Sequence, residues 1–176
     1  MRDIILDRDG VINLDSDAYV KSVDEWIAID SSIQAISQLH QAGYRVFVAT
    51  NQSGIGRGFF SLQTLQDMHH KMCSLINHAG GLISDIAYCP HTPEDNCTCR
   101  KPKAGLLTRL AADHQIDLTQ AIVIGDSLRD LQAADQVGAT GLLVLTGKGQ
   151  RTRQQNPTLP YPIFETLYDA TKSILS

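Results

Sequence analysis

The sequence predicts an α/β fold in which a mainly parallel sheet is covered by helices on both faces. Short apolar runs of strand length alternate five times with longer segments whose apolar residues recur at helical spacing. The chain has 176 residues, of which 43% are hydrophobic and 19% charged, as in ordinary domains that build their own core. No repeat, low-complexity tract or linker divides it, so we expect a single domain over residues 1–176.

Five apolar runs, rich in β-branched residues, are too short for helices and predict strands. In chain order they are residues 3–6, 45–50, 83–89, 121–124 and 141–145. We expect no inserted cap domain, because only a loop fits after the first strand and one helix fits after the second. Ligands of such sheets bind beyond the carboxyl ends of the strands, so polar residues needed for chemistry should follow these runs.

Five longer segments carry apolar residues at helical spacing and predict helices. In chain order they are residues 33–42, 62–79, 104–114, 128–137 and 164–175. We expect Ser31 or Ser32 to cap the first helix and Ser61 to cap the second, because a serine hydroxyl accepts hydrogen bonds from free N–H groups at a helix start. The last helix follows a loop interrupted by prolines.

Composition and charge exclude several functional classes. Fifteen Lys and Arg against nineteen Asp and Glu leave a net charge of −4, which favours neither nucleic acid nor an anionic membrane as a partner. The longest aliphatic runs are strand-sized, and no signal-peptide pattern is visible. We therefore expect a cytoplasmic protein. It shows no heptad or exposed apolar stripe, so we also expect a monomer.

Two carboxylates follow the first strand in the run Asp7-Arg8-Asp9-Gly10. At positions i and i+2 of an extended chain they project from the same side, about 6–7 Å apart. One can stay ionised as nucleophile and metal ligand, while the other, its pKa raised by its charged neighbour, serves as an acid. The same residues also fit a polar strand end in which the glycine makes a turn.

Three further polar segments follow strands or precede a helix. Residues 50–54 (TNQSG) can gather phosphate oxygens, and residues 100–102 (RKP) offer a guanidinium fork and an ammonium group. In residues 125–130 (GDSLRD), Asp126 can bind a hard cation, although Asp126 or Ser127 can instead cap the next helix. Each segment alone is explained by turns, solvated cations or caps. Together they occupy the strand-end positions that a parallel sheet reserves for chemistry.

The order DRDGV, VATNQSG, RKP and GDSLRD resembles the four motifs of the haloacid dehalogenase (HAD) superfamily of phosphotransferases, over about residues 3–146. The resemblance implies a HAD-like, Rossmannoid three-layer fold and an aspartyl-phosphate mechanism. It makes Asp7 the nucleophile and Asp9 the general acid and base. It also implies that Thr50 holds a phosphoryl oxygen and that Lys101 neutralises charge. The Mg²⁺ ligands that it implies are Asp7, Asp9, through its carbonyl oxygen, and Asp126.

Three of the four cysteines lie within eleven residues, together with a histidine. In a reducing compartment such a cluster favours metal over disulfides, and three thiolates with one imidazole suit a closed tetrahedral zinc site. The expected ligands of this zinc loop, residues 89–99, are Cys89, His91, Cys97 and Cys99. The bound zinc would stiffen residues 92–96 and so fix Arg100 and Lys101 over the phosphate.

The zinc loop beside RKP resembles one branch of the superfamily, which contains the heptose 1,7-bisphosphate 7-phosphatases and the histidinol-phosphate phosphatases. Residues 51–58 (NQSGIGRG) and 13–20 (NLDSDAYV) resemble the heptose group. This implies an Mg²⁺-dependent phosphatase that removes the 7-phosphate of D-glycero-D-manno-heptose 1,7-bisphosphate, in the supply of ADP- or GDP-heptose for lipopolysaccharide core or surface glycans. The substrate contacts that it implies are Asp15, Tyr19, Asn51, Gln52, Ser53, Arg57 and Arg100.

Two alternatives stay open at this point. The short zinc loop also fits histidinol-phosphate phosphatases, and Ser127 stands where some heptose enzymes have lysine. A phospho-accepting receiver domain would likewise place an aspartate, a hydroxyl and a lysine at strand ends, although it needs neither Asp9 nor a zinc loop. We assign packing or surface roles to His69 and the other helical histidines, and expect Asp130 to orient neighbours of the metal site.

Overall fold

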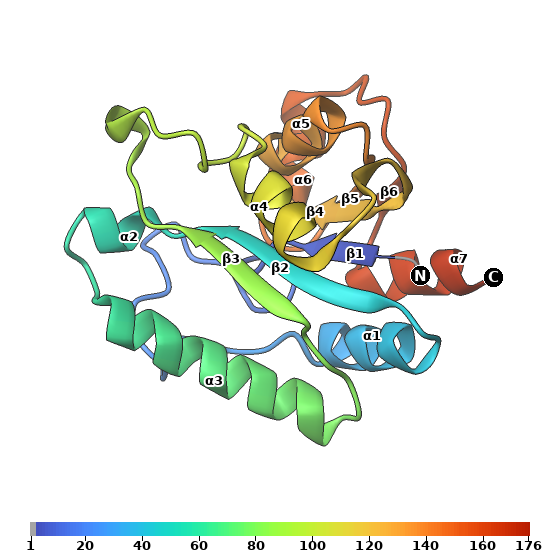
Figure 1. The fold of residues 1–176 in the computed structure, drawn as a ribbon, viewed down its shortest axis with the longest axis horizontal. Coiled ribbons are helices and arrows are strands. Elements are labelled where there is room, and N and C mark those ends of the chain that lie inside the picture. The colour runs from blue at the N-terminus through green and yellow to red at the C-terminus, as the bar shows by residue number, and fades with distance from the viewer. Residues whose placement is uncertain (1–2) are drawn as a thin grey trace.

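The structure, a computed structural model, describes residues 3–176 and places one six-stranded parallel sheet between helices (Figure 1). The first two residues of the expected domain, Met1 and Arg2, lie outside the described residues. The strands are β1 (Asp3–Leu6), β2 (Arg45–Asn51), β3 (Asp85–Cys89), β4 (Ile122–Gly125), β5 (Thr140–Val144) and β6 (Ile163–Phe164). All five predicted strands are confirmed. The two-residue β6 was missed because it is too short to show a periodicity.

The strand order is β3-β2-β1-β4-β5-β6, so the chain builds outward from β1 on one side and then crosses to the other. Leu6, near the end of β1, pairs with Val48 in β2 and Ile124 in β4. The carboxyl ends of these three strands therefore meet at one edge. In open parallel sheets, the point where the strand order reverses is where ligands bind.

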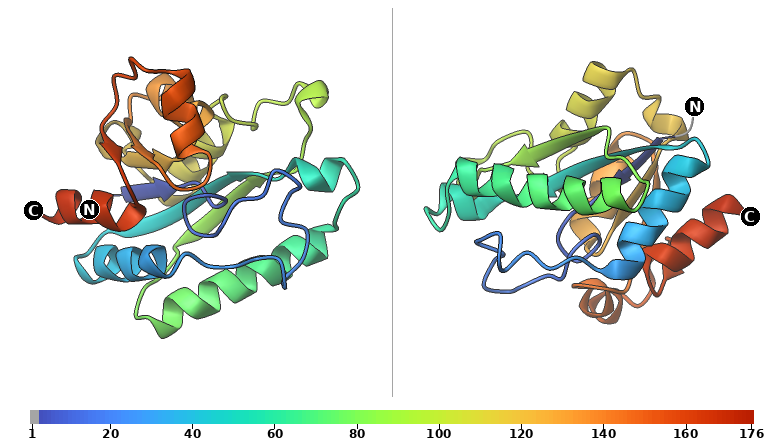
Figure 2. Two further views of the ribbon diagram at one scale, coloured as in Figure 1. Left: turned by 180° about the vertical axis from the view of Figure 1, so that it is seen from behind. Right: turned by 90° about the horizontal axis from the view of Figure 1, so that it is seen from below.

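The helices are α1 (Asp30–Gln41), α2 (Ser53–Gly56), α3 (Leu62–His78), α4 (Gly105–His114), α5 (Leu128–Gln136), α6 (Gly149–Gln155) and α7 (Leu167–Leu175). Figures 1 and 2 show α1, α3 and α7 on one face of the sheet and α4 and α5 on the other. The five predicted helices are confirmed, and the short α2 and α6 are additional. Among the described helices, none is both long and apolar enough to cross a membrane.

Of the two helix caps predicted from the sequence, one is confirmed and one is wrong. Ser61 accepts a hydrogen bond from the backbone N–H of Thr64 and caps α3, as predicted. The cap predicted for α1 was wrong: the helix begins at Asp30 and no side chain caps it. Ser32 instead donates its hydroxyl to the carbonyl oxygen of Val11 at 2.6 Å, because α1 packs against the loop that follows β1.

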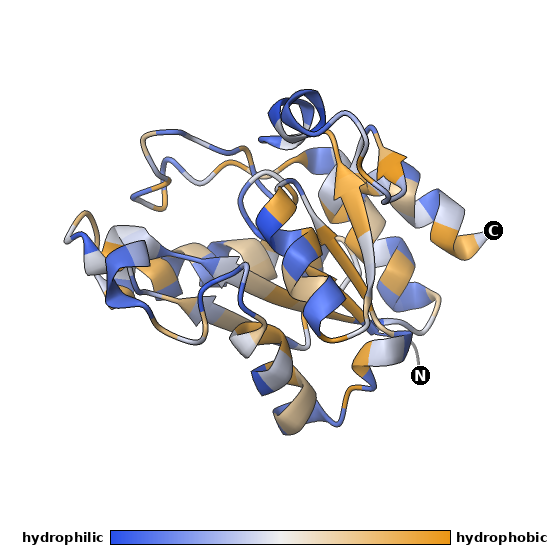
Figure 3. Cartoon of the chain, turned by 90° about the horizontal axis from the view of Figure 1, so that it is seen from above, coloured by the Kyte–Doolittle hydropathy of each residue, from blue (hydrophilic) through white to orange (hydrophobic). Residues whose placement is uncertain are grey.

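Successive strand residues alternate between two apolar clusters. Ile4 and Leu6 of β1 pack with α1, α3 and α7, whereas Ile5 between them packs with α4 and α5. In Figure 3 the strands form the apolar centre of the molecule, and polar colours dominate the loops at the sheet edge. Burial on both faces makes the sheet a firm base for the loops at its carboxyl edge.

The segment between β1 and α1 is a long loop without a regular helix or strand. Trp26 anchors it, since its side chain is completely buried in the core. Lys71 of α3 adds hydrogen bonds to the carbonyl oxygens of Val23 and Trp26, at 2.8 and 2.7 Å. The loop is therefore held at its far end while residues near its start face the carboxyl edge of the sheet.

Candidate active site

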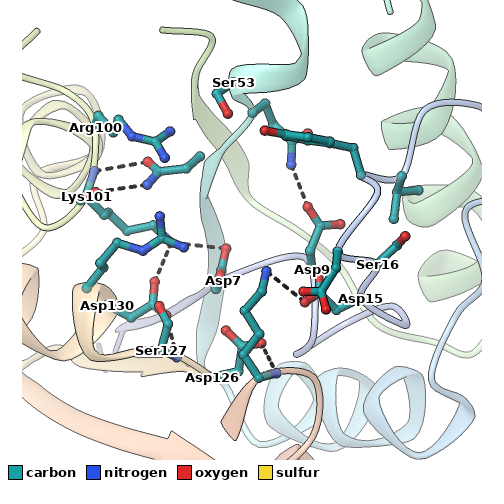
Figure 4. Close-up of a pocket in the computed structure, with 17 residues that line it drawn as sticks. Asp7, Asp9, Asp15, Ser16, Ser53, Arg100, Lys101, Asp126, Ser127 and Asp130 are labelled. Carbon is teal, nitrogen blue, oxygen red and sulfur yellow. Dashed lines mark hydrogen bonds and ion pairs between the residues drawn. The ribbon is translucent and has the colours of Figure 1, made fainter. Parts of the chain in front are cut away.

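A cavity of about 290 Å³ opens at the carboxyl ends of β1 and β4 (Figure 4). It brings together side chains from both halves of the chain. The predicted site residues that line it are Asp7, Asp9, Asp15, Tyr19, Asn51, Gln52, Ser53, Arg100, Lys101 and Asp126. The strand-end rule therefore located most of this cavity from the sequence.

Lys101 lies at the base of the cavity and is only 3% exposed. Its Nζ lies 3.0 Å from Asp7 Oδ1 and 2.6 Å from Asp130 Oδ1, and donates a hydrogen bond to the Ala49 carbonyl oxygen. Burial disfavours the ammonium charge, but Asp130 and Asp7 outweigh it and raise the pKa of Lys101. The cavity thus contains a permanent positive charge against Asp7.

Asp7 and Asp126 share a site with too much negative charge. Burial is the main cause that raises the pKa of Asp7 to about 6, against the opposing charge of Lys101. Burial, with the charges of Asp7 and Asp130, raises the pKa of Asp126 well above its usual value. One oxygen from each of these three carboxylates lies within 4.8 Å of the others. Hard oxygen ligands that destabilise one another's charge suit a cation such as Mg²⁺.

The backbone comes close to Asp126 on one side. Gly10 has a φ of +83°, and a Cβ atom there would collide with the Asp126 carboxylate, as would a Cβ atom at Gly147. The backbone N–H of Lys148 donates to Asp126 Oδ2 at 2.7 Å. Glycine at these two positions is therefore what lets the carboxylate lie against the main chain.

Asp9 is held by donors from three residues. Arg8 Nη2 and Asn13 Nδ2 each lie 2.8 Å from its Oδ1, and Gln52 Nε2 lies 2.8 Å from its Oδ2. Burial opposes the charge of Asp9, but Arg8 and the hydrogen bonds outweigh it and lower the pKa of Asp9. The sequence argument, which assigned the raised pKa to this member of the pair, was wrong because it did not foresee that Arg8 folds onto its neighbour.

Three predicted residues at the carboxyl end of β2, Thr50, Asn51 and the following Gln52, differ in their surroundings. Asn51 exchanges two hydrogen bonds with the backbone of Lys101, each of 3.0 Å. Gln52 donates to the hydroxyl oxygen of Thr50 as well as to Asp9, at 2.9 and 2.8 Å. Thr50 is 1% exposed and lies behind the residues that line the cavity. The amides of Asn51 and Gln52 are thus used largely within the protein.

The zinc loop forms a second, separate cluster, whose three cysteines are free of disulfides. The sulfurs of Cys89, Cys97 and Cys99 are 3.0 to 3.6 Å apart, and His91 Nδ1 lies 3.3 Å from Cys99 Sγ and 3.6 Å from Cys89 Sγ. A tetrahedral zinc with Zn–S bonds of about 2.3 Å requires sulfur–sulfur edges of about 3.8 Å, so small shifts would let these side chains hold such a metal.

One thiol of this cluster ionises readily. Burial opposes ionisation of Cys97, but the backbone N–H of Arg100 and the neighbouring thiols lower its pKa to about 6. Burial raises the pKa of Cys89 to about 12, with a further contribution from Cys99. Sulfurs this close together disfavour one another's negative charge, and a bound metal would relieve that repulsion because it binds thiolates.

The chain is similar to known proteins over almost its full length. The family model described as HAD-hydrolase-like matches residues 98–170. A D-glycero-beta-D-manno-heptose-1,7-bisphosphate 7-phosphatase of Neisseria meningitidis is 52% identical over 99% of this chain and 95% of its own. One of Pseudomonas putida is 48% identical over 99% of this chain and all of its own.

A crystal structure agrees with these relatives. The D,D-heptose 1,7-bisphosphate phosphatase of B. bronchiseptica, complexed with magnesium and phosphate, superposes with a TM-score of 0.96. It is 48% identical and covers 99% of this chain and 98% of its own. The chain belongs to the heptose 1,7-bisphosphate 7-phosphatase family. This heptose phosphatase family lies within the HAD superfamily, as the four motifs implied.

Sequence reasoning missed two cationic residues at the rim of this heptose-phosphatase cavity. Lys148 pairs with Asp15 at 2.9 Å, and its position soon after the fifth strand was a signal that the strand-end rule could have used. Arg129 also lines the cavity, yet it stood in the GDSLRD motif without an assigned role. Burial and the charge of Arg129 lower the pKa of Arg100, so positive charge accumulates at this rim.

Arg57 is the predicted substrate contact that lies outside the cavity lining. It is exposed, and its guanidinium lies 3.9 Å from Glu94 in the zinc loop. It follows α2, a short helix that turns the chain away from the cavity and was not predicted. In this heptose phosphatase family member, α2 therefore directs Arg57 toward the zinc loop.

Proposed function

We propose that the protein hydrolyses the 7-phosphate ester of D-glycero-D-manno-heptose 1,7-bisphosphate through a phosphorylated Asp7. The observation that carries this proposal is the pairing of Asp7 with a buried, charged lysine beside a second carboxylate, Asp9, in one cavity. Heptose phosphatases that are about half identical to the chain support the choice of substrate over histidinol phosphate. They support an enzyme over a receiver domain in the same way.

In the first step, an Asp7 carboxylate oxygen attacks the phosphorus and the bond from phosphorus to the sugar oxygen breaks. Asp9 gives its proton to the departing sugar oxygen. The free protein holds Asp9 ionised, and the arriving phosphate dianion raises its pKa by repulsion, which lets it carry that proton. Lys101 offsets the charge that accumulates on Asp7 and the phosphoryl oxygens.

In the second step, Asp9 removes a proton from water, which attacks the phosphorus and releases phosphate from Asp7. The donors to Asp9 from Arg8, Asn13 and Gln52 keep its carboxylate beside the reaction. Thr50 accepts a hydrogen bond from Gln52 and keeps its own hydroxyl proton to donate to a phosphoryl oxygen. Together the two steps return Asp7 to a free carboxylate and leave Asp9 protonated, as it was when the first step began.

The metal that fits the carboxylate site is Mg²⁺. The ligands that would hold it are the carboxylates of Asp7 and Asp126 and the carbonyl oxygen of Asp9. When bound, Mg²⁺ supplies positive charge that offsets the repulsion between a carboxylate nucleophile and a phosphate dianion. Asp130 lies near the same carboxylates but pairs with Lys101 and caps α5 through Ser127, so we assign it to positioning.

The metal that fits the cysteine cluster is zinc, with a structural role. Four protein ligands fill a tetrahedral site and leave no position for a reacting water. Residues 92–96 contribute no side chain to the apolar core, so the metal would supply the rigidity of this loop. Arg100 and Lys101 follow directly, and a fixed loop would hold both toward the substrate.

The rim of the cavity suits a substrate with a second phosphate. Arg100, Arg129 and Lys148 provide positive charge there, and Asp15, Tyr19 and Ser53 add polar groups that suit sugar hydroxyls. We propose that the chain works as a single cytoplasmic domain and as a monomer. Its product would enter the supply of nucleotide-activated heptose for lipopolysaccharide core or surface glycans.

The test is a comparison of kcat/KM for heptose 1,7-bisphosphate and histidinol phosphate, measured side by side with added Mg²⁺. We expect the heptose bisphosphate to be preferred at least 100-fold, as is typical when a site is built for groups that the competitor lacks. Analysis of the product should show loss of the 7-phosphate alone. A preference for histidinol phosphate would overturn the proposal.

A further inference from the structure

Arg8 is a buried cation that lies between the two catalytic carboxylates in the sequence. Its side chain is completely buried, and a buried guanidinium is stable only when its charge and its donors are satisfied. Its Nε and Nη2 meet Asp9 Oδ1 at 3.1 and 2.8 Å, and Nη2 also reaches Asp9 Oδ2 at 3.1 Å. These contacts use one side of the guanidinium.

The other side of the guanidinium meets a residue from a distant part of the chain. Arg8 Nη1 lies 3.3 Å from Nε2 of His69, in the middle of α3. The ring of His69 also lies beside the ring of Tyr88 in β3, with centroids 6.5 Å apart. His69 thus connects the helix layer to the guanidinium that holds Asp9.

The chemistry of this contact defines the state of the histidine. A guanidinium can only donate hydrogen bonds, so Nε2 of His69 must be the acceptor and the ring must be neutral with its proton on Nδ1. Burial, followed by the charge of Arg8, lowers the pKa of His69 to about 3, which is consistent with a neutral ring at every working pH. Protonation of His69 therefore does not interrupt the contact near neutral pH.

We infer that His69 is a positioning residue that acts through Arg8 to hold the carboxylate of Asp9 where it serves as general acid and base. Arg8 makes three of the five hydrogen bonds to the Asp9 carboxylate. Among the described residues it is the only charged donor to that carboxylate. With Nη1 unpartnered, the guanidinium would rotate to satisfy that donor and would carry Asp9 with it. The inference rests on the proposed role of Asp9.

The experiment compares His69→Phe, which keeps a ring but removes the acceptor, with His69→Gln, whose side-chain oxygen can reach the place of Nε2. His70→Phe is the matched control, because His70 is the next residue on α3 and is exposed. Each variant is assayed with heptose 1,7-bisphosphate and with p-nitrophenyl phosphate. The sugar oxygen needs a proton to depart, whereas p-nitrophenolate does not.

The value to compare is kcat/KM, because it covers the steps up to loss of the leaving group. We expect His69→Phe to lower kcat/KM about tenfold for the heptose substrate, because a misplaced general acid loses part of its contribution to the rate. For the aryl phosphate, which needs no acid, we expect a loss of less than about twofold. His69→Gln and His70→Phe should stay within about twofold of wild type for both substrates.

Other outcomes have definite meanings. An equal loss with both substrates would show that His69 supports the fold or the whole site, and no loss with either would show that Arg8 does not need it; both overturn the inference. If the wild type hydrolyses p-nitrophenyl phosphate and alkyl phosphates other than the heptose substrate, but not the heptose substrate itself, the proposed substrate fails. The same comparison on an accepted alkyl phosphate then still tests His69.

Discussion

The side-chain amide of Asn51 holds the main chain of Lys101 at both ends. Its Nδ2 donates to the Lys101 carbonyl oxygen, and its Oδ1 accepts from the Lys101 N–H, each at 3.0 Å. These two hydrogen bonds resemble the pair of N–H to C=O bonds that two residues exchange between neighbouring strands, although β2 ends at Asn51. The loop that carries the Lys101 ammonium group is therefore attached to the sheet by a side chain.

Asn51→Ala should lower both activity and stability. Two unpaired backbone groups at Lys101 would let the loop shift, and a displacement of about 1 Å can cost on the order of 100-fold in kcat. We expect a loss of about 1–2 kcal/mol in the free energy of unfolding, measured by urea denaturation. Asn77→Ala, at an exposed position on α3, is the control and should change neither quantity.

Asp7→Asn should abolish turnover and leave the fold intact. The amide cannot act as the nucleophile, whereas its size and shape match the carboxylate, so the circular dichroism spectrum should be unchanged. We expect residual activity below about 1%, since covalent catalysis cannot proceed without the nucleophile. A variant that retains more than this would contradict the assignment of Asp7.

Binding of Mg²⁺ should weaken as the pH falls below about 6. The pKa of Asp7 is raised to about 6 and that of Asp126 is raised as well, so protons occupy both carboxylates at lower pH and compete with the cation. Affinity should fall about tenfold or more for each pH unit below this value, because at least one proton is displaced. Calorimetric titration with Mg²⁺ at pH 5 and pH 7.5 measures the effect. Equal affinities at the two pH values would contradict it.

Cys99→Ser should remove the metal from the zinc loop and impair catalysis while the bulk fold survives. Elemental analysis should find one zinc per wild-type chain and none in the variant. The expected loss in kcat is on the order of 100-fold, because Arg100 and Lys101 lose their rigid support. Cys73→Ser is the matched control, since Cys73 is far from the zinc loop on α3.

Catalysis should still require added Mg²⁺ when zinc is fully bound, because a closed four-ligand site has no position for water. Removing Mg²⁺ alone with a chelator that leaves the zinc in place distinguishes the two metals. Full Mg²⁺-dependent activity in zinc-free wild-type protein would overturn the structural role of the loop.

The sheet and most of its helices were predictable from sequence because burial on both faces leaves unbroken apolar runs such as residues 46–49 and 121–124. The strand-end rule then located Asp7 and Asp126, and the position of Lys101 before a predicted helix drew attention to it, without any knowledge of contacts. These predictions depend on patterns within a few residues. Such patterns are visible in a single sequence.

The parts that escaped prediction depend on contacts between distant segments. Arg8 turns one side of its guanidinium toward Asp9, and the other side contacts His69, 61 positions later. Lys148 reaches Asp15 across the cavity, and α2 directs Arg57 away from it. Periodicity carries no information about these side-chain directions. For the same reason, the sequence argument assigned the raised pKa to Asp9, whereas the structure raises the pKa of Asp7 and lowers that of Asp9.

The long loop after β1 leaves the carboxylates of Asp7 and Asp9 in contact with solvent: their side chains are 14% and 22% exposed. No inserted domain lies between β1 and α1 to close over them. Bulk water therefore reaches a phosphorylated Asp7 as soon as the sugar has left. An acceptor alcohol would have to compete with the solvent itself, so this architecture favours hydrolysis over transfer of the phosphoryl group to a second sugar.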